Sequence, residues 1–180
     1  MNSKLFKAFS VLVLLILVTV IAYGILTHLY PQNYKQHIEK YASEYNIKPE
    51  LIYAIVKCES NFKAESVSHA GAIGLMQITP ETFKWATQRA GDKNLTENSI
   101  YDAVTNIKYG CYIFSLFLDE FESEQTALAC YNAGRGSVLK WLDNKKYSDD
   151  GIILKEIPFE ETREYVKKVI NTAKIYKTLY

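Results

Sequence analysis

Residues 49–60 read PELIYAIVKCES, a short amphipathic helix with an acidic side chain where an apolar one is expected. Pro49 suits the first turn of a helix, where its missing N–H needs no partner. Ile52 and Ile55 belong to an apolar stripe, and the next position of that stripe is Glu59. A carboxylate among apolar groups loses solvation when it ionises, so its pKa rises toward neutrality. This property suits a general acid. The alternative interpretation is that the helix simply ends at this position and the Glu59 side chain turns into solvent.

Residues 8–30 form an uninterrupted apolar segment near the start of the chain. They lack charged side chains except for His28, and a helix of about 20 apolar residues can span a bilayer. Lys4 and Lys7 precede the segment and favour a cytoplasmic N-terminus. We therefore predict a transmembrane anchor over residues 1–30 in a bacterial cell membrane, with the remaining chain on the extracytoplasmic side.

A cleaved signal segment is the alternative for this region. Residues 22–24 read AYG and loosely meet the small-x-small rule for cleavage, which would release a secreted domain. The apolar run continues through Ile25 and Leu29, and this favours a retained anchor. The first cysteine is Cys58, so lipidation of an N-terminal cysteine is excluded.

Residues 31–180 are long enough for one domain with a substantial core. The whole chain has 21 Lys and Arg against 20 Asp and Glu, and this near-neutral balance gives no basic footprint for nucleic acid. Five basic residues cluster near the C-terminus, and we interpret them as the solvated face of the last helix. An anionic polymer or the membrane surface is the alternative partner for that cluster. Its members are Arg163, Lys167, Lys168, Lys174 and Lys177.

The domain is predicted to be all-α. Thr79 and Pro80 provide an N-cap and a first turn, Asn98 or Asp102 caps a later helix, and Gly134 and Gly136 stop another. The only candidate for an extended piece is residues 152–157, and residues 61–79 are expected to be irregular. Helices are expected over residues 34–46, 49–60, 79–90, 98 or 102 to 121, 124–132, 138–142 and 160–179.

Neither a metal ion nor a cofactor is expected. Cys58, Cys111 and Cys130 lack metal-ligand spacing. Cys111 lies on an apolar stripe and is predicted to be a buried free thiol, with a Cys111–Cys130 disulfide as the alternative. Residues 92–96 begin like a calcium loop, but the glycine and the closing glutamate of such a loop are missing.

Four motifs occur in a fixed order along the domain. They read ESNF at 59–62, SHAGAIGLMQ at 68–77, ACYNAG at 129–134 and IPFEETREYV at 157–166. Together they resemble the catalytic domain of the soluble lytic murein transglycosylases, which share a goose-lysozyme-like helical fold. The resemblance covers about residues 35–176, nearly all of the predicted domain.

The resemblance implies a reaction with one catalytic carboxylate. Glu59 would protonate the bond between N-acetylmuramic acid and N-acetylglucosamine in peptidoglycan. Most glycosidases use a second carboxylate, but in this family the 2-acetamido group of the substrate takes that part. Ionised Glu59 would then act as a base on the C6 hydroxyl and close a 1,6-anhydro ring. Its pKa must therefore lie near the working pH.

The resemblance also assigns supporting residues. Ser68 and Gln77 match positions that hydrogen-bond the sugar, and Tyr131 matches a tyrosine near the reacting acetamido group, with Asn132 beside it. Glu161 matches a position that organises the far side of the cleft. The alternatives are structural: Tyr131 packs in the core, and Glu161 favours the first turn of the last helix. The implied partners are peptidoglycan strands and the membrane, and partners in envelope machinery stay unknown.

Two other functions remain open from the sequence. A lysozyme-type muramidase would hydrolyse the same bond and would need a second carboxylate, for which Glu65, Asp102 and Glu161 are the candidates. A non-catalytic wall-binding or assembly module would need no catalytic acid.

Overall fold

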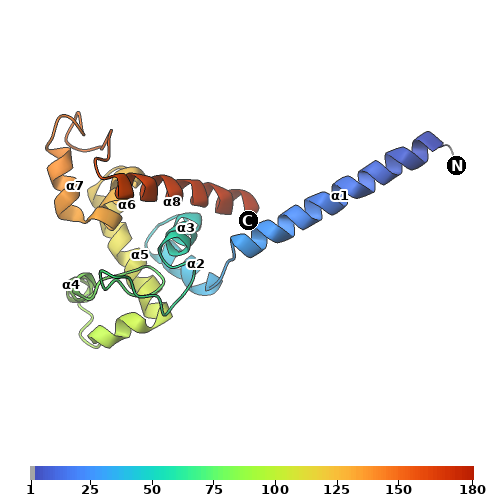
Figure 1. Ribbon diagram of the computed structural model, residues 1–180. Coiled ribbons are helices and arrows are strands. Elements are labelled where there is room, and N and C mark those ends of the chain that lie inside the picture. Colours follow the sequence, from blue (N-terminus) through green and yellow to red (C-terminus); the bar gives the residue numbers. More distant parts are fainter. Residues whose placement is uncertain (1–2) are drawn as a thin grey trace.

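The computed structural model describes residues 3–180, and this part of the chain is entirely helical apart from loops and isolated bridges (Figure 1). The all-α class predicted from the sequence is therefore confirmed. The elements are α1 (Ser3–Leu29), α2 (Lys35–Glu44), α3 (Pro49–Glu59), α4 (Pro80–Ala90), the 3-10 helix η1 (Glu97–Tyr101), α5 (Ala103–Glu120), α6 (Glu124–Ala133), α7 (Arg135–Leu142) and α8 (Glu160–Leu179).

Helix α1 projects away from the group formed by the other helices (Figure 1). Its stretch Phe9–Leu29 is long and apolar enough to cross a membrane, and none of it is buried against the rest of the protein. Side chains such as Leu14 and Ile16 are more than half exposed. A continuous apolar surface of this kind is unfavourable in water and fits a lipid environment.

The core is built around α3, whose residues 51–56 are all buried. This helix packs against α2 and most extensively against α8, which contributes Val166 and Val169 to the core. Helix α5 packs against α2, α4 and α6. Full burial of one such aliphatic side chain stabilises the fold by about 1.5–3 kcal/mol. The result is that α3 is held rigidly up to its last turn, which ends at Glu59.

A cluster of four tyrosines joins the end of α1 to α8. The Tyr176 hydroxyl donates to the Pro31 carbonyl at 3.0 Å, and the Tyr180 hydroxyl donates to the Tyr30 carbonyl at 2.9 Å. The Tyr176 ring meets the Tyr30 ring edge-on at 5.8 Å and stacks on the Tyr53 ring at 5.1 Å. The short connection from α1 to α2 is thus tied to the last helix of the domain.

Capping residues set the helix starts as the sequence indicates. The Thr79 hydroxyl accepts a hydrogen bond from the Thr82 N–H at 3.2 Å, and Pro80 opens α4. The Asp102 carboxylate accepts from the Thr105 N–H at 2.8 Å, so Asp102 caps α5 while Asn98 lies within η1. These side chains satisfy N–H groups that a helix start leaves unpaired.

Two expectations about local structure are wrong. Gly134 ends α6 with φ +82°, but Gly136 lies inside α7, which begins at Arg135 rather than at residue 138. Residues 152–157 form no strand, because the Asp150 carboxylate accepts from two successive N–H groups and bends the chain. Asp92, the first of the residues that begin like a calcium loop, pairs with Lys108 and Tyr109.

All three cysteines are free, so the alternative of a Cys111–Cys130 disulfide is wrong. Both thiols are buried, as expected for Cys111, but they face different charged neighbours. Cys111 lies near Glu44 at the end of α2, whereas Cys130 lies near Glu120 and Arg135. The packing of α5 on α6 therefore directs the two side chains to different parts of the core.

Candidate active site

Glu59 is the last residue of α3 and lies half-buried where this helix meets α8. Burial raises the pKa of its carboxyl to about 7, and the Tyr165 hydroxyl and the Lys168 ammonium oppose that rise. Glu59 is thus present in both protonation states near neutral pH. A side chain in this condition can donate a proton in one step and accept one in the next.

Two phenols from different helices lie near the Glu59 carboxylate. Tyr131 of α6 donates to the Met76 carbonyl at 2.8 Å and packs edge-on against the Phe114 ring at 5.9 Å. Tyr165 of α8 has a buried hydroxyl that makes no regular hydrogen bond within the described residues. Burial raises the pKa of both phenols well above its ordinary value, and the Glu59 charge raises it further. Both hydroxyls therefore keep their protons: Tyr131 donates its proton to the Met76 carbonyl, and the Tyr165 proton is available to an acceptor beside Glu59.

Ser60 and Asn106 fix the loop that faces Glu59. The Ser60 hydroxyl donates to the Leu75 carbonyl at 2.9 Å. The buried Asn106 side chain donates to the Ile73 carbonyl at 3.0 Å and accepts from the Met76 N–H at 2.8 Å. A Cβ atom at Gly74 would lie 2.4 Å from the Asn106 amide nitrogen, so only glycine fits there. These contacts hold residues 73–77 in place without regular secondary structure.

Two cavities adjoin this centre and have no lining residue in common. The larger cavity, of about 860 Å³, lies between α4, α5 and α6 and is lined by Gln77, Trp85, Phe117 and Tyr131 among others. The smaller cavity, of about 420 Å³, contains Glu59. Its other lining residues are Tyr30, Lys57, Cys58, Ser60, Asn61, Lys63, Ser66, Lys168 and Thr172. Tyr131 lines the larger cavity, and the charge of Glu59 raises the pKa of its hydroxyl, so Tyr131 lies within electrostatic range of the acid in the smaller cavity.

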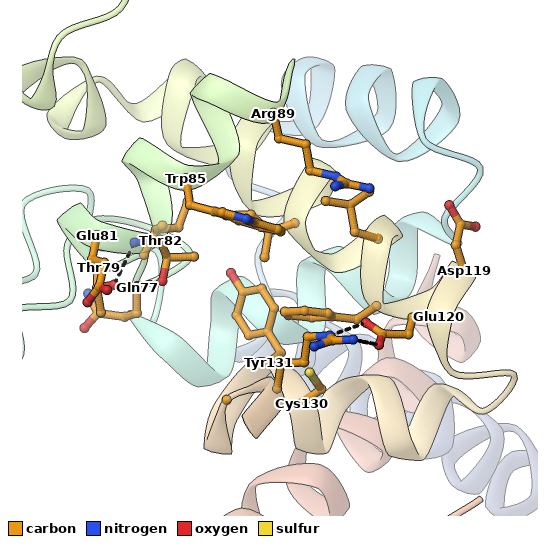
Figure 2. Close-up of a pocket in the computed structure, with 16 residues that line it drawn as sticks. Gln77, Thr79, Glu81, Thr82, Trp85, Arg89, Asp119, Glu120, Cys130 and Tyr131 are labelled. Atoms are coloured by element: carbon orange, nitrogen blue, oxygen red, sulfur yellow. Dashed lines mark hydrogen bonds and ion pairs between the residues drawn. The ribbon is translucent and has the colours of Figure 1, made fainter. Parts of the chain in front are cut away.

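In the larger cavity, Trp85 from α4 and Tyr131 from α6 point into the same space (Figure 2). The Trp85 side chain is 42% exposed, and the Arg89 guanidinium lies over its indole ring at 6.0 Å. Across the cavity, Arg135 forms a bidentate pair with Glu120, with Nε 2.8 Å from both carboxylate oxygens. The cavity therefore combines exposed aromatic surface with charged side chains of both signs, which is a surface suited to a polar ring-shaped ligand.

The structure brings three of the six predicted site residues together. Glu59, Gln77 and Tyr131 line the cavities, and both N–H groups of the Gln77 amide are used within the loop. They donate to the Ser66 carbonyl at 3.1 Å and to the Gly74 carbonyl at 2.9 Å. The Gln77 backbone has φ +48°, which turns this side chain back across its own loop. The amide oxygen is the group left for a ligand.

The other three predicted residues line neither cavity. Ser68 is exposed, and its hydroxyl accepts from the Ala72 N–H at 3.0 Å. Asn132 is half-buried beside Tyr131, and Glu161 is exposed in the first turn of α8. Among the other carboxylates considered for a hydrolase, Glu65 is exposed and Asp102 caps α5. The structure brings none of these carboxylates into the cavity of Glu59.

Three residues of the site lie outside the set named from the sequence. Tyr165 belongs to the motif at 157–166 but carried no assigned role. Lys168 was assigned to the solvated face of α8, yet its charge acts on Glu59. A sequence pattern could have indicated Trp85. Phe83 and Ala86 form the buried face of α4, and Trp85 lies off that face, where a large aromatic side chain suggests a binding surface.

A family model for the "Transglycosylase SLT domain" matches residues 36–153. The membrane-bound lytic murein transglycosylase C of Actinobacillus pleuropneumoniae is 30% identical over 81% of this chain and 46% of its own length. The soluble lytic murein transglycosylase of Escherichia coli K12 is 33% identical over 78% of this chain and 22% of its own length.

The chain is also similar to a solved structure of a lytic transglycosylase. The 70 kDa soluble lytic transglycosylase from Escherichia coli has a TM-score of 0.75 and 29% identity, covering 85% of this chain and 25% of that one. The chain thus spans less than half the length of each of these relatives. The resemblance seen in the sequence motifs is confirmed, and the chain belongs to the transglycosylase SLT domain family.

Proposed function

We propose that the chain is a membrane-associated lytic transglycosylase. It cleaves peptidoglycan between N-acetylmuramic acid and N-acetylglucosamine and forms 1,6-anhydro-N-acetylmuramic acid. The observation that carries this proposal is the state of Glu59, a desolvated carboxyl with a pKa of about 7 and the only acidic residue that lines its cavity. A catalyst that must act first as an acid and then as a base needs such a pKa.

In the first step, protonated Glu59 donates its proton to the glycosidic oxygen. The leaving sugar departs, and the acetamido oxygen of the muramic acid attacks C1 as the C1–O bond breaks, so the positive charge is shared with the acetamido group. The buried Tyr165 hydroxyl lies beside Glu59 and supplies a fixed donor to the reacting centre, while the Tyr131 hydroxyl donates to the Met76 carbonyl and offers its oxygen as an acceptor. The Tyr165 donor is already held in place by the packing of α8, so little reorganisation is needed as charge develops.

In the second step, ionised Glu59 removes the proton from the C6 hydroxyl of the same sugar. The C6 oxygen attacks C1, the acetamido oxygen leaves, and the 1,6-anhydro ring closes without water. Glu59 regains its proton and is ready for another cycle. Lys168 favours the ionised form of Glu59 between the two steps, while burial favours the protonated form.

The glycan strand runs through the larger cavity on its way to Glu59. Trp85 and Phe117 offer aromatic faces on which sugar rings stack, and the Gln77 amide oxygen accepts a hydrogen bond from the strand. Tyr131 belongs to this binding surface and lies within electrostatic range of Glu59. Residues 31–180 thus act as the catalytic domain, and Ser68, Asn132 and Glu161 contribute by shaping its edges.

The membrane anchor is proposed to be α1, within residues 1–30. Its apolar exposed surface and the names of the membrane-bound relatives both indicate membrane association. Lys4 and Lys7 at its start favour an extracytoplasmic position for the catalytic domain. Protease treatment of intact spheroplasts tests this orientation: degradation of the domain is expected, and full protection would contradict it.

The reaction is tested by digesting purified murein with the full chain in detergent and analysing the muropeptides by mass spectrometry. Products that end in anhydro-muramic acid are expected. A majority of products with reducing-end muramic acid would instead identify a hydrolase. Binding of murein without any cleavage would support the wall-binding module. The variant Glu65→Gln serves as a matched control, because a hydrolase would need a second carboxylate and a transglycosylase does not.

A further inference from the structure

Three lysines line the smaller cavity together with Glu59, and they come from three different segments. Lys57 lies on α3, Lys63 in the loop that follows, and Lys168 on α8. Lys57 donates to the Asn61 side chain, whereas Lys63 and Lys168 form no ion pair with any residue that the structure describes. We call this group, Lys57, Lys63 and Lys168 around Glu59, the lysine pocket.

The lysine pocket carries an unbalanced positive charge in a chain whose formal net charge is only +1. Glu59 is the only acid among its lining residues and is protonated part of the time. Burial lowers the pKa of Lys57, and the nearby charge of Lys168 lowers it further. The cations therefore repel one another within a concave surface, where field lines are concentrated. An anionic group that enters the pocket would relieve this repulsion.

We propose that the lysine pocket is a specificity subsite for the carboxylates of the peptide stem carried by muramic acid. The inference rests on the proposed function, because only a muramic acid next to the scissile bond brings a stem to Glu59. That sugar bears a lactyl group to which the peptide is attached, so the free carboxylates of the stem are the nearest anions of the substrate. Lysine suits them, because its ammonium is a compact charge on a flexible side chain and can follow a mobile peptide.

The membrane surface is the competing source of anions. Tyr30, at the end of α1, also lines the pocket, and its ring lies 5.7 Å from the Lys57 ammonium. A stem carboxylate is favoured because the charge of Lys168 reaches Glu59 itself, so this lysine lies within the range of the reacting groups. No step of the proposed reaction, in contrast, brings a lipid headgroup to the Glu59 carboxyl.

The test compares two substrates prepared from the same murein: glycan strands with intact stems, and strands freed of stems by an amidase. The full chain in detergent is assayed as wild type, as Lys63→Gln/Lys168→Gln, and as the charge-matched control Lys140→Gln/Lys174→Gln. Both control lysines are exposed and lie outside the two cavities. The readout is the ratio of kcat/KM on stem-bearing strands to kcat/KM on bare strands. Any effect of Lys168 on Glu59 itself cancels in this ratio.

The ratio is expected to fall by about threefold to tenfold in Lys63→Gln/Lys168→Gln, as for the loss of two partly exposed ion pairs, and to stay unchanged in the control. The wild-type ratio should also fall as salt shortens the screening length from about 10 Å at 0.1 M to about 3 Å at 1 M. An equal ratio in the wild type and in Lys63→Gln/Lys168→Gln would overturn the subsite.

Assays on reconstituted vesicles distinguish the membrane surface from the peptide stem as the source of the anion. If the Lys63→Gln/Lys168→Gln variant differs from the wild type only on anionic vesicles, and not in its substrate ratio, the lysines serve the membrane surface and the proposal is wrong. Absence of anhydro products from both substrates would instead contradict the proposed function. The two failures are therefore distinct.

Discussion

The two cavities beside Glu59 differ in how their charges are arranged. In the larger cavity, charges of both signs occur beside aromatic rings: Arg135 is paired with Glu120, Arg89 lies over the Trp85 indole, and Asp119 also lines the cavity. In the smaller cavity, Lys63 and Lys168 line the same space as Glu59 and have no ion-pair partner among the described residues. Aromatic faces suit the binding of sugar rings, whereas an excess of cations attracts an anion, and Lys168 lowers the pKa of Glu59. We therefore assign substrate binding to the larger cavity and proton transfer to the smaller one.

The largest effect is expected where the chemistry resides. Glu59→Gln removes the one carboxyl group among the described residues that line the smaller cavity, so kcat should fall by about 10²–10⁴-fold while murein binding through the larger cavity persists. Rates of muropeptide release and a pull-down with insoluble murein measure the two properties. Glu65→Gln, an exposed acid outside both cavities, is the control and should keep full activity. If Glu59→Gln retained full activity, the assignment of proton transfer to the smaller cavity would be wrong.

The same substitution should also change stability with a defined sign. The folded pKa of Glu59 is raised above its unfolded value of 4.5, so folding favours its protonated form. That stabilisation is complete below the unfolded pKa and is lost as pH rises through about 7. Urea unfolding should show Glu59→Gln gaining stability relative to the wild type between these limits, by at most about 2 kcal/mol after allowance for partial solvation. A variant that loses stability on the alkaline side would contradict the desolvation argument.

Asn106→Ala should affect both cavities, because Asn106 holds the loop that lies between them. It leaves the Ile73 carbonyl and the Met76 N–H without their partner in a buried site. We expect a loss of about 2–4 kcal/mol in the free energy of unfolding, measured by urea denaturation. Asn98→Ala, at an exposed position in η1, should stay within about 0.5 kcal/mol of the wild type. A small effect at Asn106 would mean that the loop is held by its other contacts.

Trp85→Ala should weaken binding without changing the chemistry. Loss of one stacking face is expected to raise KM by about tenfold and to leave kcat and its pH dependence unaltered, as for an aromatic contact of about 1–1.5 kcal/mol. Steady-state kinetics on soluble glycan strands measures this. Tyr101→Ala removes an aromatic ring that is also exposed but lies outside the cavities, and it should have no effect. A change in the pH profile of Trp85→Ala would show that the larger cavity also influences the pKa of Glu59, and would contradict this prediction.

The smallest effect is a shift in pH dependence. Wild-type kcat/KM should fall as pH rises through about 7, because the first step needs protonated Glu59. The Tyr165 hydroxyl lowers the pKa of Glu59, so Tyr165→Phe should move this midpoint to higher pH. Tyr147→Phe, at a tyrosine outside both cavities, is the control. A shift toward lower pH in Tyr165→Phe would show that this hydroxyl stabilises the protonated carboxyl instead.

Local chemistry explains which features the sequence predicted. A hydroxyl or carboxylate before a helix satisfies N–H groups a few residues away, so Thr79 and Asp102 mark helix starts without any knowledge of the fold. The apolar stripe of α3 likewise indicates that Glu59 lies against the core. At Gly134 and Gly136 the sequence alone was ambiguous, because either glycine can end a helix and only the one with positive φ does so.

Tertiary packing explains what was missed. Lys168 reaches Glu59 only because α8 packs along α3, and nothing near either residue in the chain indicates that contact. Ser68 follows the family motif, but the turn of its loop directs its hydroxyl to the Ala72 N–H. Motif matching thus assigns residues to a site, while their distances and charges depend on helices that meet from distant parts of the chain.

The tyrosine cluster limits how far the domain can lie from the end of α1. The Tyr176 and Tyr180 hydroxyls bind the carbonyls of Pro31 and Tyr30, so little slack remains between the end of α1 and the domain. If α1 lies in the bilayer, as we propose, the domain is held close to the membrane surface rather than on a long flexible tether. The proposed activity would then be confined to substrate within about one domain height of the membrane.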